Sequence, residues 1–333
     1  MNKGVAVAGN MAVDILCKVQ GLPYPGELTT ILEGISRSSG GALCNVITNL
    51  ARLDPSLPLT ALGRLGTDAE GDFIVSLLKK YDSIDISHVK REGTTSLTYV
   101  MADEITKQRS FYYYPGANAR FSENDINWDT VTADFLHIGY ILVLDTLDMA
   151  DDEFGTRMAR LLFQARERGI KTSVDVVSEN SDRFKLLVPP ALKYTDYCII
   201  NEFEAEKTTG VSLRDDKKNL IFSNMKEALE KLKSYGVSSW AVIHSPEGGF
   251  GLDSAGSYEE IPSLKLPDGY IKGTVGAGDA FCSGVLYGAY KGLSLRESLE
   301  MGTAAASCCL SEPGATEGMC SMEDAMVLYR KYR

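Results

Sequence analysis

The sequence lacks the two glycine-rich motifs that most often hold nucleotides. The chain of 333 residues contains no GxxxxGK[ST] loop, and its first apolar run continues as "AGNMAVD", which does not have the GxGxxG spacing. A P-loop needs the first pattern, and a dinucleotide-binding turn needs the second. Any nucleotide site in this chain must therefore use a different turn.

Ligands for a structural zinc ion are also sparse. The three histidines, His88, His137 and His244, are far apart in sequence, and there is no CxxC pair. Because structural zinc sites usually show short ligand spacings, no such site is predicted. The cysteines lie mostly in apolar stretches, which predicts buried, reduced thiols of a cytosolic protein. They are Cys17, Cys44, Cys198, Cys282, Cys308, Cys309 and Cys320.

Long apolar runs and excess positive charge are absent as well. No stretch approaches the ~20 apolar residues of a membrane span, and the N-terminal apolar run breaks at Gly9 and Asp14, unlike that of a signal peptide. The net charge of -11 argues against nucleic acid or an anionic membrane as a bulk partner. These absences predict a cytoplasmic protein without nucleic-acid or membrane partners. A local anion pocket is still compatible with an acidic chain.

The chain does contain alternating strand-like and helix-like segments. This alternation predicts an α/β fold with a mostly parallel sheet covered on both faces, in a single domain over residues 1–333. Strand-rich stretches at about 12–36 and 95–114 break the alternation and predict a small additional sheet, the second stretch as a hairpin. The expected strands are 5–8, 135–138, 171–177, 196–201 and 239–245, and the expected helices are 42–53, 70–81, 154–168, 202–209 and 226–235, with others from about 277, 295 and 323.

One glycine-rich turn near the C-terminus precedes a helical pattern. Residues 271–292 read "IKGTVGAGDAFCSGVLYGAYKG", with Gly273, Gly276 and Gly278 before the helix. Unpaired amides at a helix start attract anions, and glycines let a phosphate approach the backbone. The pattern fits either an anion site or a tight structural turn. Asp279 follows at once, and a carboxylate beside a phosphate is repelled unless it takes part in the chemistry.

Five motifs together resemble the ribokinase-like (PfkB) family of carbohydrate kinases. In chain order they are "GGALCN" from Gly40, "LGRLGTDAEGDFI", "PGAN", "NEFE" and "GTVGAGDAFCSG" from Gly273. The last is similar to the family's DTxGAGDxFxxG, and the first to its GGxxxN. The resemblance implies a three-layer α/β/α domain with a small β-sheet lid formed by the 12–36 and 95–114 stretches. It also implies an ATP-dependent kinase for a primary hydroxyl of a small sugar.

The resemblance gives the glycine-rich turn a catalytic role. Asp279 would be the base that takes the proton of the acceptor hydroxyl, and the amides of Gly276, Ala277, Gly278 and Asp279 would form the anion hole. Phosphoryl transfer has a loose transition state, so positioning and charge stabilisation do most of the work and a weak base suffices. The alternative is that Asp279 only caps its helix.

The resemblance also implies a substrate site in the N-terminal half. Asp14, Gly40, Gly41 and Asn45 would bind the substrate's hydroxyls. Paired glycines permit close approach, and an Asp with an Asn supplies complementary donor and acceptor atoms. The alternative is a solvated loop acid beside an ordinary turn.

For the nucleotide, the resemblance implies ATP with Mg²⁺. Asn201 and Glu204 would hold the magnesium–phosphate assembly, mostly through water, although both residues also favour an ordinary helix start. His244 is equally suited to packing and to contacting the nucleotide. The full set assigned to ATP is Asn201, Glu204, His244, Gly249, Thr274 and Thr303.

Several positions depart from the family pattern. Gly273 replaces an Asp that helps a monovalent-cation site in several members, so a need for K⁺ is open, with carbonyls near Val275 and in 311–316 as remaining ligands. The loop at 244–246 differs where the family contacts the nucleotide, and Thr303 replaces a usual Asn. Ala12 and Ala42 replace residues typical of ribokinases proper, which argues against strict ribose specificity.

Two other functions compete with the sugar kinase. The family also accepts nucleosides, and a non-catalytic sugar-binding sensor would keep the fold; the retained Asp279 and glycines argue against the sensor. A homodimer through the lid is expected from the resemblance. The aromatic run Phe111, Tyr112, Tyr113 and Tyr114 is expected to pack within the core and sheet rather than to stack on substrate.

Overall fold

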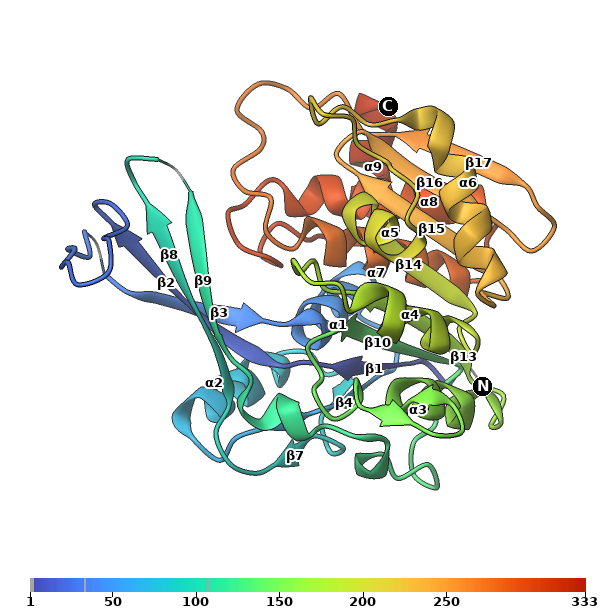
Figure 1. Cartoon of the computed structure of the whole chain (residues 1–333), viewed down its shortest axis with the longest axis horizontal. Helices are drawn as coiled ribbons and strands as arrows, with labels where there is room; N and C mark the ends of the chain where they lie inside the picture. Colours follow the sequence, from blue (N-terminus) through green and yellow to red (C-terminus); the bar gives the residue numbers. More distant parts are fainter. Residues whose placement is uncertain (1–2, 33, 107) are drawn as a thin grey trace.

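The computed structural model describes residues 3–32, 34–106 and 108–333. A nine-stranded sheet runs through the molecule in the order β17-β16-β15-β14-β13-β10-β1-β4-β6 (Figure 1). All neighbours are parallel except at the β16 and β17 edge, where the pairing is antiparallel. The strands are β1 (Val5–Gly9), β4 (Leu59–Leu62), β6 (Ile84–Asp85), β10 (Phe135–Ile141), β13 (Lys171–Val176), β14 (Tyr197–Asn201), β15 (Trp240–Ser245), β16 (Gly248–Leu252) and β17 (Tyr258–Pro262).

Helices cover both faces of this sheet, as the alternating pattern predicts. One apolar cluster joins the sheet to α3 (Arg157–Arg166), α4 (Phe184–Leu192), α5 (Glu202–Thr209) and α6 (Phe222–Ser234). Two further clusters join the opposite face to α1 (Ala42–Leu53), α2 (Ala69–Leu78), α7 (Ala277–Tyr290), α8 (Leu295–Cys309) and α9 (Met322–Tyr332). The three-layer α/β/α class is confirmed, because strands buried on both faces need a helix layer on each side.

A second, four-stranded sheet stands at one end of the body (Figure 1). Its order is β3-β2-β8-β9, with β3 (Ser36–Gly40) and β9 (Arg109–Tyr114) at the edges and β2 (Ala12–Val19) and β8 (Ser96–Asp103) between them. The antiparallel β8–β9 pair confirms the predicted hairpin. Glu33 and Lys107, which fall in the two strand-rich stretches of the sequence, lie outside the described residues.

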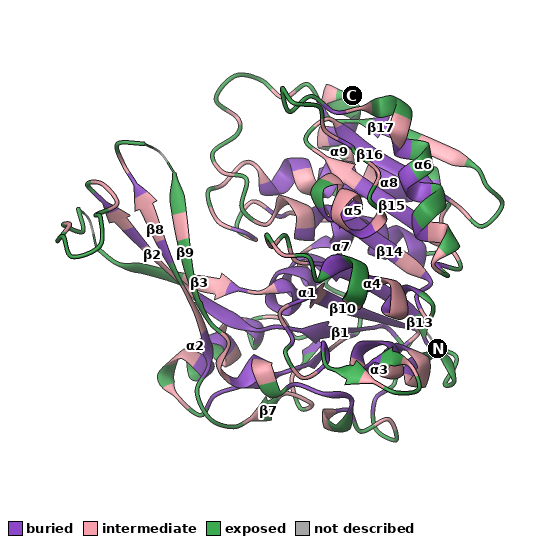
Figure 2. Ribbon diagram, in the orientation of Figure 1, coloured by how far each residue is buried: buried purple, intermediate pink, exposed green. Residues whose placement is uncertain are grey.

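The lid sheet, as we call these four strands, carries exposed aromatic side chains. The expectation that the aromatic run packs in the core is wrong, since Phe111 is 65% and Tyr112 59% exposed, and Tyr113 and Tyr114 are exposed too. The outer parts of β8 and β9 are largely intermediate or exposed (Figure 2). Successive strand residues point to opposite faces, so both faces of β9 are open to solvent along this run.

Shorter elements complete the chain. They are the strands β5 (Arg64–Leu65), β7 (Lys90–Arg91), β11 (Ala150–Asp151) and β12 (Gly155–Thr156), and the 3-10 turns at Gly116–Arg120 and Glu123–Asp125. Within the described ranges, no helix combines the length and apolarity needed to cross a membrane. Six of the seven cysteines are buried, as expected, and Cys320 is half-buried.

Candidate active site

The site lies where the parallel strands of the main sheet end. Tyr140 at the end of β10, Asp175 in β13, Asn201 at the end of β14 and His244 in β15 line one polar pocket of about 220 Å³ together with the start of α7. Parallel strands bring their carboxyl ends to the same edge, which is where open α/β sheets bind ligands. Residues far apart in the sequence thereby meet in one place.

The glycine-rich turn becomes the N-terminus of α7. Gly276 precedes the helix at φ 75°, a left-handed conformation that favours glycine. A side chain there would also collide with the backbone of Ala315. Gly278 is less crowded, because a Cβ there would lie 3.1 Å from the His244 ring. The first-turn amides of α7 are therefore free of covering side chains at this point, as an anion hole requires.

Asp279 lies in the first turn of α7 and is 4% exposed. Its Oδ2 accepts from Asn45 Nδ2 at 2.8 Å, and both oxygens lie 3.1 Å from the Tyr140 hydroxyl, which donates to them. Burial raises the pKa of Asp279, and these two donors oppose that rise. The carboxylate is thus held by side chains from α1 and β10, more than 130 residues away in sequence.

The predicted substrate residues gather around Asn45. Asp14 is in β2, paired with Thr98 of β8, whose hydroxyl bonds to the carboxylate. A side chain at Gly40 would occupy the position of the Asp14 carboxyl group, so that residue must be glycine for Asp14 to take this orientation. Gly41 directly precedes α1, and Asn45 lies in its first turn. The Oδ1 atom of Asn45 is buried without a hydrogen-bond partner among the described residues.

Two asparagines that the sequence analysis did not single out shape this region. Asn10 Oδ1 accepts from the Ala42 amide at 2.9 Å, which caps α1 from the end of β1. Asn118, the last residue of "PGAN", exchanges two hydrogen bonds with the Met11 backbone at 3.1 and 3.0 Å. Asn118 lies in a motif and Asn10 does not, and only the fold shows that their partners are the backbone groups of Met11 and Ala42.

Asn201 and Glu204 form a capping box at the start of α5. Asn201 Oδ1 accepts from the Glu204 amide, and Glu204 Oε2 accepts from the Asn201 amide, both at 2.9 Å. Glu204 Oε1 also accepts from Ser178. Both the helix-start interpretation and the functional interpretation thus have a structural basis, because the same side chains face the polar pocket.

The polar pocket is strongly acidic. Burial raises the pKa of Glu204 to about 8, with repulsion from Asp279 adding to it. Burial and the charge of Asp279 also raise the pKa of Asp175. A set of hard oxygen donors with uncompensated negative charge fits Mg²⁺, which retains water and prefers carboxylate and carbonyl oxygens. Asn201 and Glu204 both line this pocket and contribute an amide oxygen and a carboxylate to the set.

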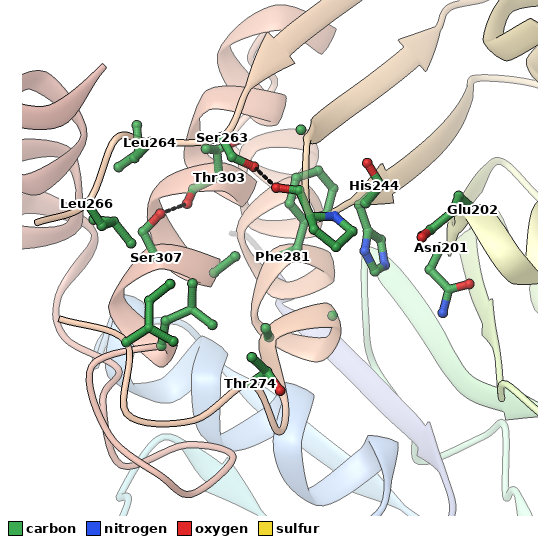
Figure 3. A pocket seen from close by; sticks show the side chains of 18 residues that line it. Asn201, Glu202, His244, Ser263, Leu264, Leu266, Thr274, Phe281, Thr303 and Ser307 are labelled. Atoms are coloured by element: carbon green, nitrogen blue, oxygen red, sulfur yellow. Dashed lines mark hydrogen bonds between the residues drawn. The ribbon is translucent and has the colours of Figure 1, made fainter. Parts of the chain in front are cut away.

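A larger cavity of about 480 Å³ adjoins the polar pocket (Figure 3). Asn201, His244 and Gly278 line both spaces. The His244 ring stacks at 5.0 Å on Phe281, and burial lowers its pKa to about 4, so the ring is neutral at pH 7. The wall is otherwise largely apolar, which suits a flat heterocycle.

Of three further residues assigned to ATP, two line this cavity and one does not. Thr274 and Thr303 line it, and the Thr303 hydroxyl is buried without a partner among the described residues. Gly249 does not belong to the lining, whereas its neighbour Gly248 does. Gly249 instead allows β16 to pack against the Phe281 ring.

The backbone at Gly273 packs tightly against a neighbouring loop. A Cβ at Gly273 would lie 2.7 Å from Pro313, so this backbone leaves no room for an acidic side chain. The carbonyls of Val275 and Ala315 both accept from the Cys309 thiol, at 3.4 and 3.3 Å. The Cys309 thiol therefore connects the loop at Val275 to the loop at Ala315. These are the loops whose carbonyls the sequence offered as ligands for K⁺.

Three residues of types that can bind a metal lie close together although they are far apart in sequence. His137, Asp175 and Cys282 are buried together, with ligand atoms within 4.8 Å of one another. The His137 ring already bonds Ser173 at 3.0 Å. Neither His137 nor Cys282 lines the polar pocket or the larger cavity, so this group packs beneath the polar pocket.

Comparison with known proteins identifies the family. A profile of the pfkB family carbohydrate kinases matches residues 2–322. The chain belongs to the PfkB family of carbohydrate kinases. Members are phosphotransferases with an alcohol group as acceptor, so the chain is an enzyme of the sugar-kinase class.

Individual PfkB relatives are distant in sequence but close in fold. The 5-dehydro-2-deoxygluconokinase of Geobacillus thermodenitrificans is 24% identical over 295 residues, covering 85% of this chain and 82% of that one. A ribokinase from Thermotoga maritima superposes with a TM-score of 0.78 at 21% identity, over 98% of this chain and 99% of its own. Arabidopsis thaliana ribokinase complexed with ribose and ATP gives 0.78 at 20% identity, over 99% of each chain. These likenesses establish the ribokinase-like fold.

Proposed function

We propose that this PfkB protein transfers the γ-phosphoryl group of ATP to a primary hydroxyl of a small, uncharged sugar. The observation that carries the proposal is the position of Asp279. It lies at the glycine-rich start of α7, in the polar pocket, and Gly278 beside it lines the larger cavity as well. One carboxylate is thus within reach of both an acceptor hydroxyl and a terminal phosphate.

On the acceptor side, Asp279 acts as the general base. Its Oδ1 has no donor besides Tyr140 among the described residues, which leaves lone pairs for the substrate hydroxyl. Asn45 and Asp14 bind neighbouring hydroxyls, and the unpartnered Oδ1 of Asn45 is an acceptor ready for one of them. The proton passes from the hydroxyl to Asp279 as the new O–P bond forms and the bond from the γ-phosphorus to its bridging oxygen breaks, which releases ADP.

On the phosphoryl side, the amides of Gly276, Ala277 and Gly278 stabilise the charge on the transferring group. They belong to the first turn of α7, in which the Ala280 amide donates to the Gly276 carbonyl at 2.8 Å. Preorganised donors of this kind need no rearrangement in the transition state. The adenine end would lie in the apolar cavity beside Phe281 and Thr303.

Asn201 and Glu204 would hold Mg²⁺ through water molecules. Bound with ATP, the ion supplies charge neutralisation for the phosphates. Burial, with the charge of Asp279 as a smaller contribution, raises the pKa of Glu204, and a bound cation would favour its charged form.

A neutral acceptor fits the pocket better than a sugar acid. The ionisable groups that raise the pKa values of Asp279 and Asp175 are other carboxylates, Asp14 and Glu204 among them. A substrate carboxylate would add to this repulsion. The relative from Geobacillus is named for a gluconate-type substrate, so the two acceptors are expected to differ.

The lid sheet would close over the sugar and exclude water.

We also propose that residues 1–333 form one domain, that the protein is cytoplasmic, and that it dimerises through the lid sheets. The exposed Tyr99, Phe111 and Tyr112 support the dimer, because apolar patches of this kind usually mark interfaces. Light scattering of the full chain and of Tyr112→Asp tests it, and a monomeric wild-type protein would refute it.

The test of the kinase is ADP release from Mg-ATP across neutral pentoses and hexoses, sugar acids and nucleosides. Turnover with a neutral sugar that Asp279→Asn abolishes supports the proposal. Turnover only with sugar acids would refute the neutral acceptor, and turnover only with nucleosides would favour a nucleoside kinase. A folded protein that binds a sugar and ATP without turnover would be a sensor.

A further inference from the structure

Tyr140 reaches the site through an irregularity in β10. The register between β10 and β13 shifts between Ile138 and Ile141, and Tyr140 has φ 66°, a left-handed conformation that is unfavourable for a tyrosine. Bulges next to active sites commonly redirect a side chain. Here the Tyr140 amide donates to Asp175 Oδ1 at 2.7 Å, which holds the strained backbone in place.

The strained backbone aims the phenol at a single group. The Tyr140 hydroxyl lies 3.1 Å from both oxygens of Asp279. The hydroxyl is the donor, because the carboxylate can only accept. A non-glycine residue in a sparsely populated conformation persists only where its surroundings enforce it, and such residues gather at functional sites.

We propose that Tyr140 is a positioning residue for the catalytic base: its phenol holds Asp279 ionised and fixes the orientation of the carboxylate toward the acceptor hydroxyl. The inference rests on the proposed role of Asp279 as base. It adds a residue that none of the recognised motifs contains.

The surroundings of Asp279 explain why such a donor is needed. The groups that act on it come from several elements, and three of them are carboxylates, with no lysine or arginine among the described ones. They are Asn45 of α1, Asp14 of β2, Tyr140 of β10, Asp175 of β13, Glu204 of α5, Cys282 of α7 and Cys309 of α8. Asn45 and Tyr140 supply the side-chain hydrogen bonds that favour the charged form.

Removal of the phenol should therefore move the protonation of Asp279 to higher pH. Loss of a hydrogen bond to a charged group is expected to raise the midpoint of that titration by about one to two pH units. In Tyr140→Phe the acid limb of kcat/KM should move up by that amount, and the plateau at high pH should fall as well, because the carboxylate loses a group that orients it. A merely structural role would lower kcat at every pH and leave the limb in place.

Tyr287→Phe is the matched control. The Tyr287 hydroxyl donates to a carboxylate, Asp54 Oδ2, at the same 3.1 Å, and it belongs to the same helix as Asp279. This bond lies outside the polar pocket, so its loss should leave the pH profile unchanged. An equal shift in both variants would overturn the assignment to Tyr140.

A substrate-free measurement separates this inference from the kinase proposal. The side-chain carboxyl ¹³C resonance that disappears in Asp279→Asn is titrated in wild type and in Tyr140→Phe. A higher midpoint in the variant supports the inference even if no acceptor is found, and an unchanged midpoint overturns it even if the kinase is active.

A second substitution guards against misfolding of Tyr140→Phe. Incorporation of 3-fluorotyrosine at position 140 keeps the shape of the ring and makes the hydroxyl a stronger donor. The midpoint of Asp279 should then move to lower pH, opposite to the shift in Tyr140→Phe. A midpoint that does not move, or that rises, contradicts the proposal.

Discussion

On the acceptor side of the active site, Asp279 is held by Asn45 and Tyr140, and each hydrogen bond joins elements that are far apart in sequence. On the nucleotide side, the cavity is walled mostly by apolar side chains and backbone, with the Thr303 hydroxyl left without a partner among the described residues. The proposed acceptor side depends on a few buried polar contacts. The proposed nucleotide side depends instead on many weak contacts along the cavity wall. Single substitutions should therefore have larger effects on the acceptor side than on the nucleotide side.

The largest effect is expected for Asp279→Asn. The amide cannot take the acceptor proton, so turnover should fall by about 10²–10⁴. ATP should bind at least as tightly as to wild type, because a negative charge beside the phosphates is removed. Steady-state kinetics and calorimetry measure the two quantities, and undiminished turnover would refute the role of Asp279 as base.

Asn45→Ala comes next. It removes the donor to Asp279 and an acceptor for the sugar, so kcat/KM for the sugar should fall about 10- to 100-fold, the value of a hydrogen bond to a charged group. KM for ATP should stay constant.

Asn49→Ala is the control for this change. Asn49 is buried one turn further along α1, and its side-chain amide has no partner among the described residues. The control should leave both kinetic constants unchanged. A loss in Asn49→Ala equal to that in Asn45→Ala would mean that the helix, and not the contact with Asp279, is responsible.

On the nucleotide side, Thr303→Val should have a smaller effect. The Thr303 hydroxyl is buried without a partner among the described residues, and Thr303 lines the cavity, so loss of one neutral hydrogen bond to the nucleotide should weaken ADP binding about threefold to tenfold. Thermal stability without nucleotide should stay the same or rise, because an unsatisfied buried hydroxyl is removed. ADP binding as tight as in wild type would place the nucleotide away from α8.

The smallest effect is expected from K⁺. Replacing K⁺ by tetramethylammonium in the assay should leave the rate unchanged, because the Cys309 thiol already bonds the Val275 and Ala315 carbonyls. Stimulation by K⁺ in wild type would contradict this, and stimulation in Cys309→Ala alone would support it.

Much of the fold could be predicted from local patterns, and the exceptions have physical causes. The amphipathic 42–53 stretch is α1, and Gly210 ends α5 in a left-handed cap at φ 78°. The strand β16 was missed because its sequence, GGFGL, has little β propensity. Its pairing with β15 on one side and β17 on the other stabilises it instead. The helix α4 was missed because it contains Pro189 and Pro190, which usually interrupt helices.

In the site, too, some residues could be predicted from the sequence and others could not. Motif resemblance alone placed Asp14, Asn45 and Asp279 in one site, and Asn45 does contact Asp279. Tyr140 carries no motif, since its position depends on a register shift in β10. The exposure of the aromatic run also could not be predicted, because an alternating strand does not reveal whether a helix layer covers it.

The sequence by itself determined the fold class, the family and the motifs on which the proposed site residues lie. The periodicity of hydrophobic residues and the positions of glycines are local properties of the sequence. Five motifs in the family's order leave little choice of family. Only the tertiary structure decided which groups set the charge of Asp279, that a thiol bridges the loops near Gly273, and that the lid sheet exposes its aromatic residues. These features depend on contacts between residues far apart in the chain, and no local pattern encodes such distances.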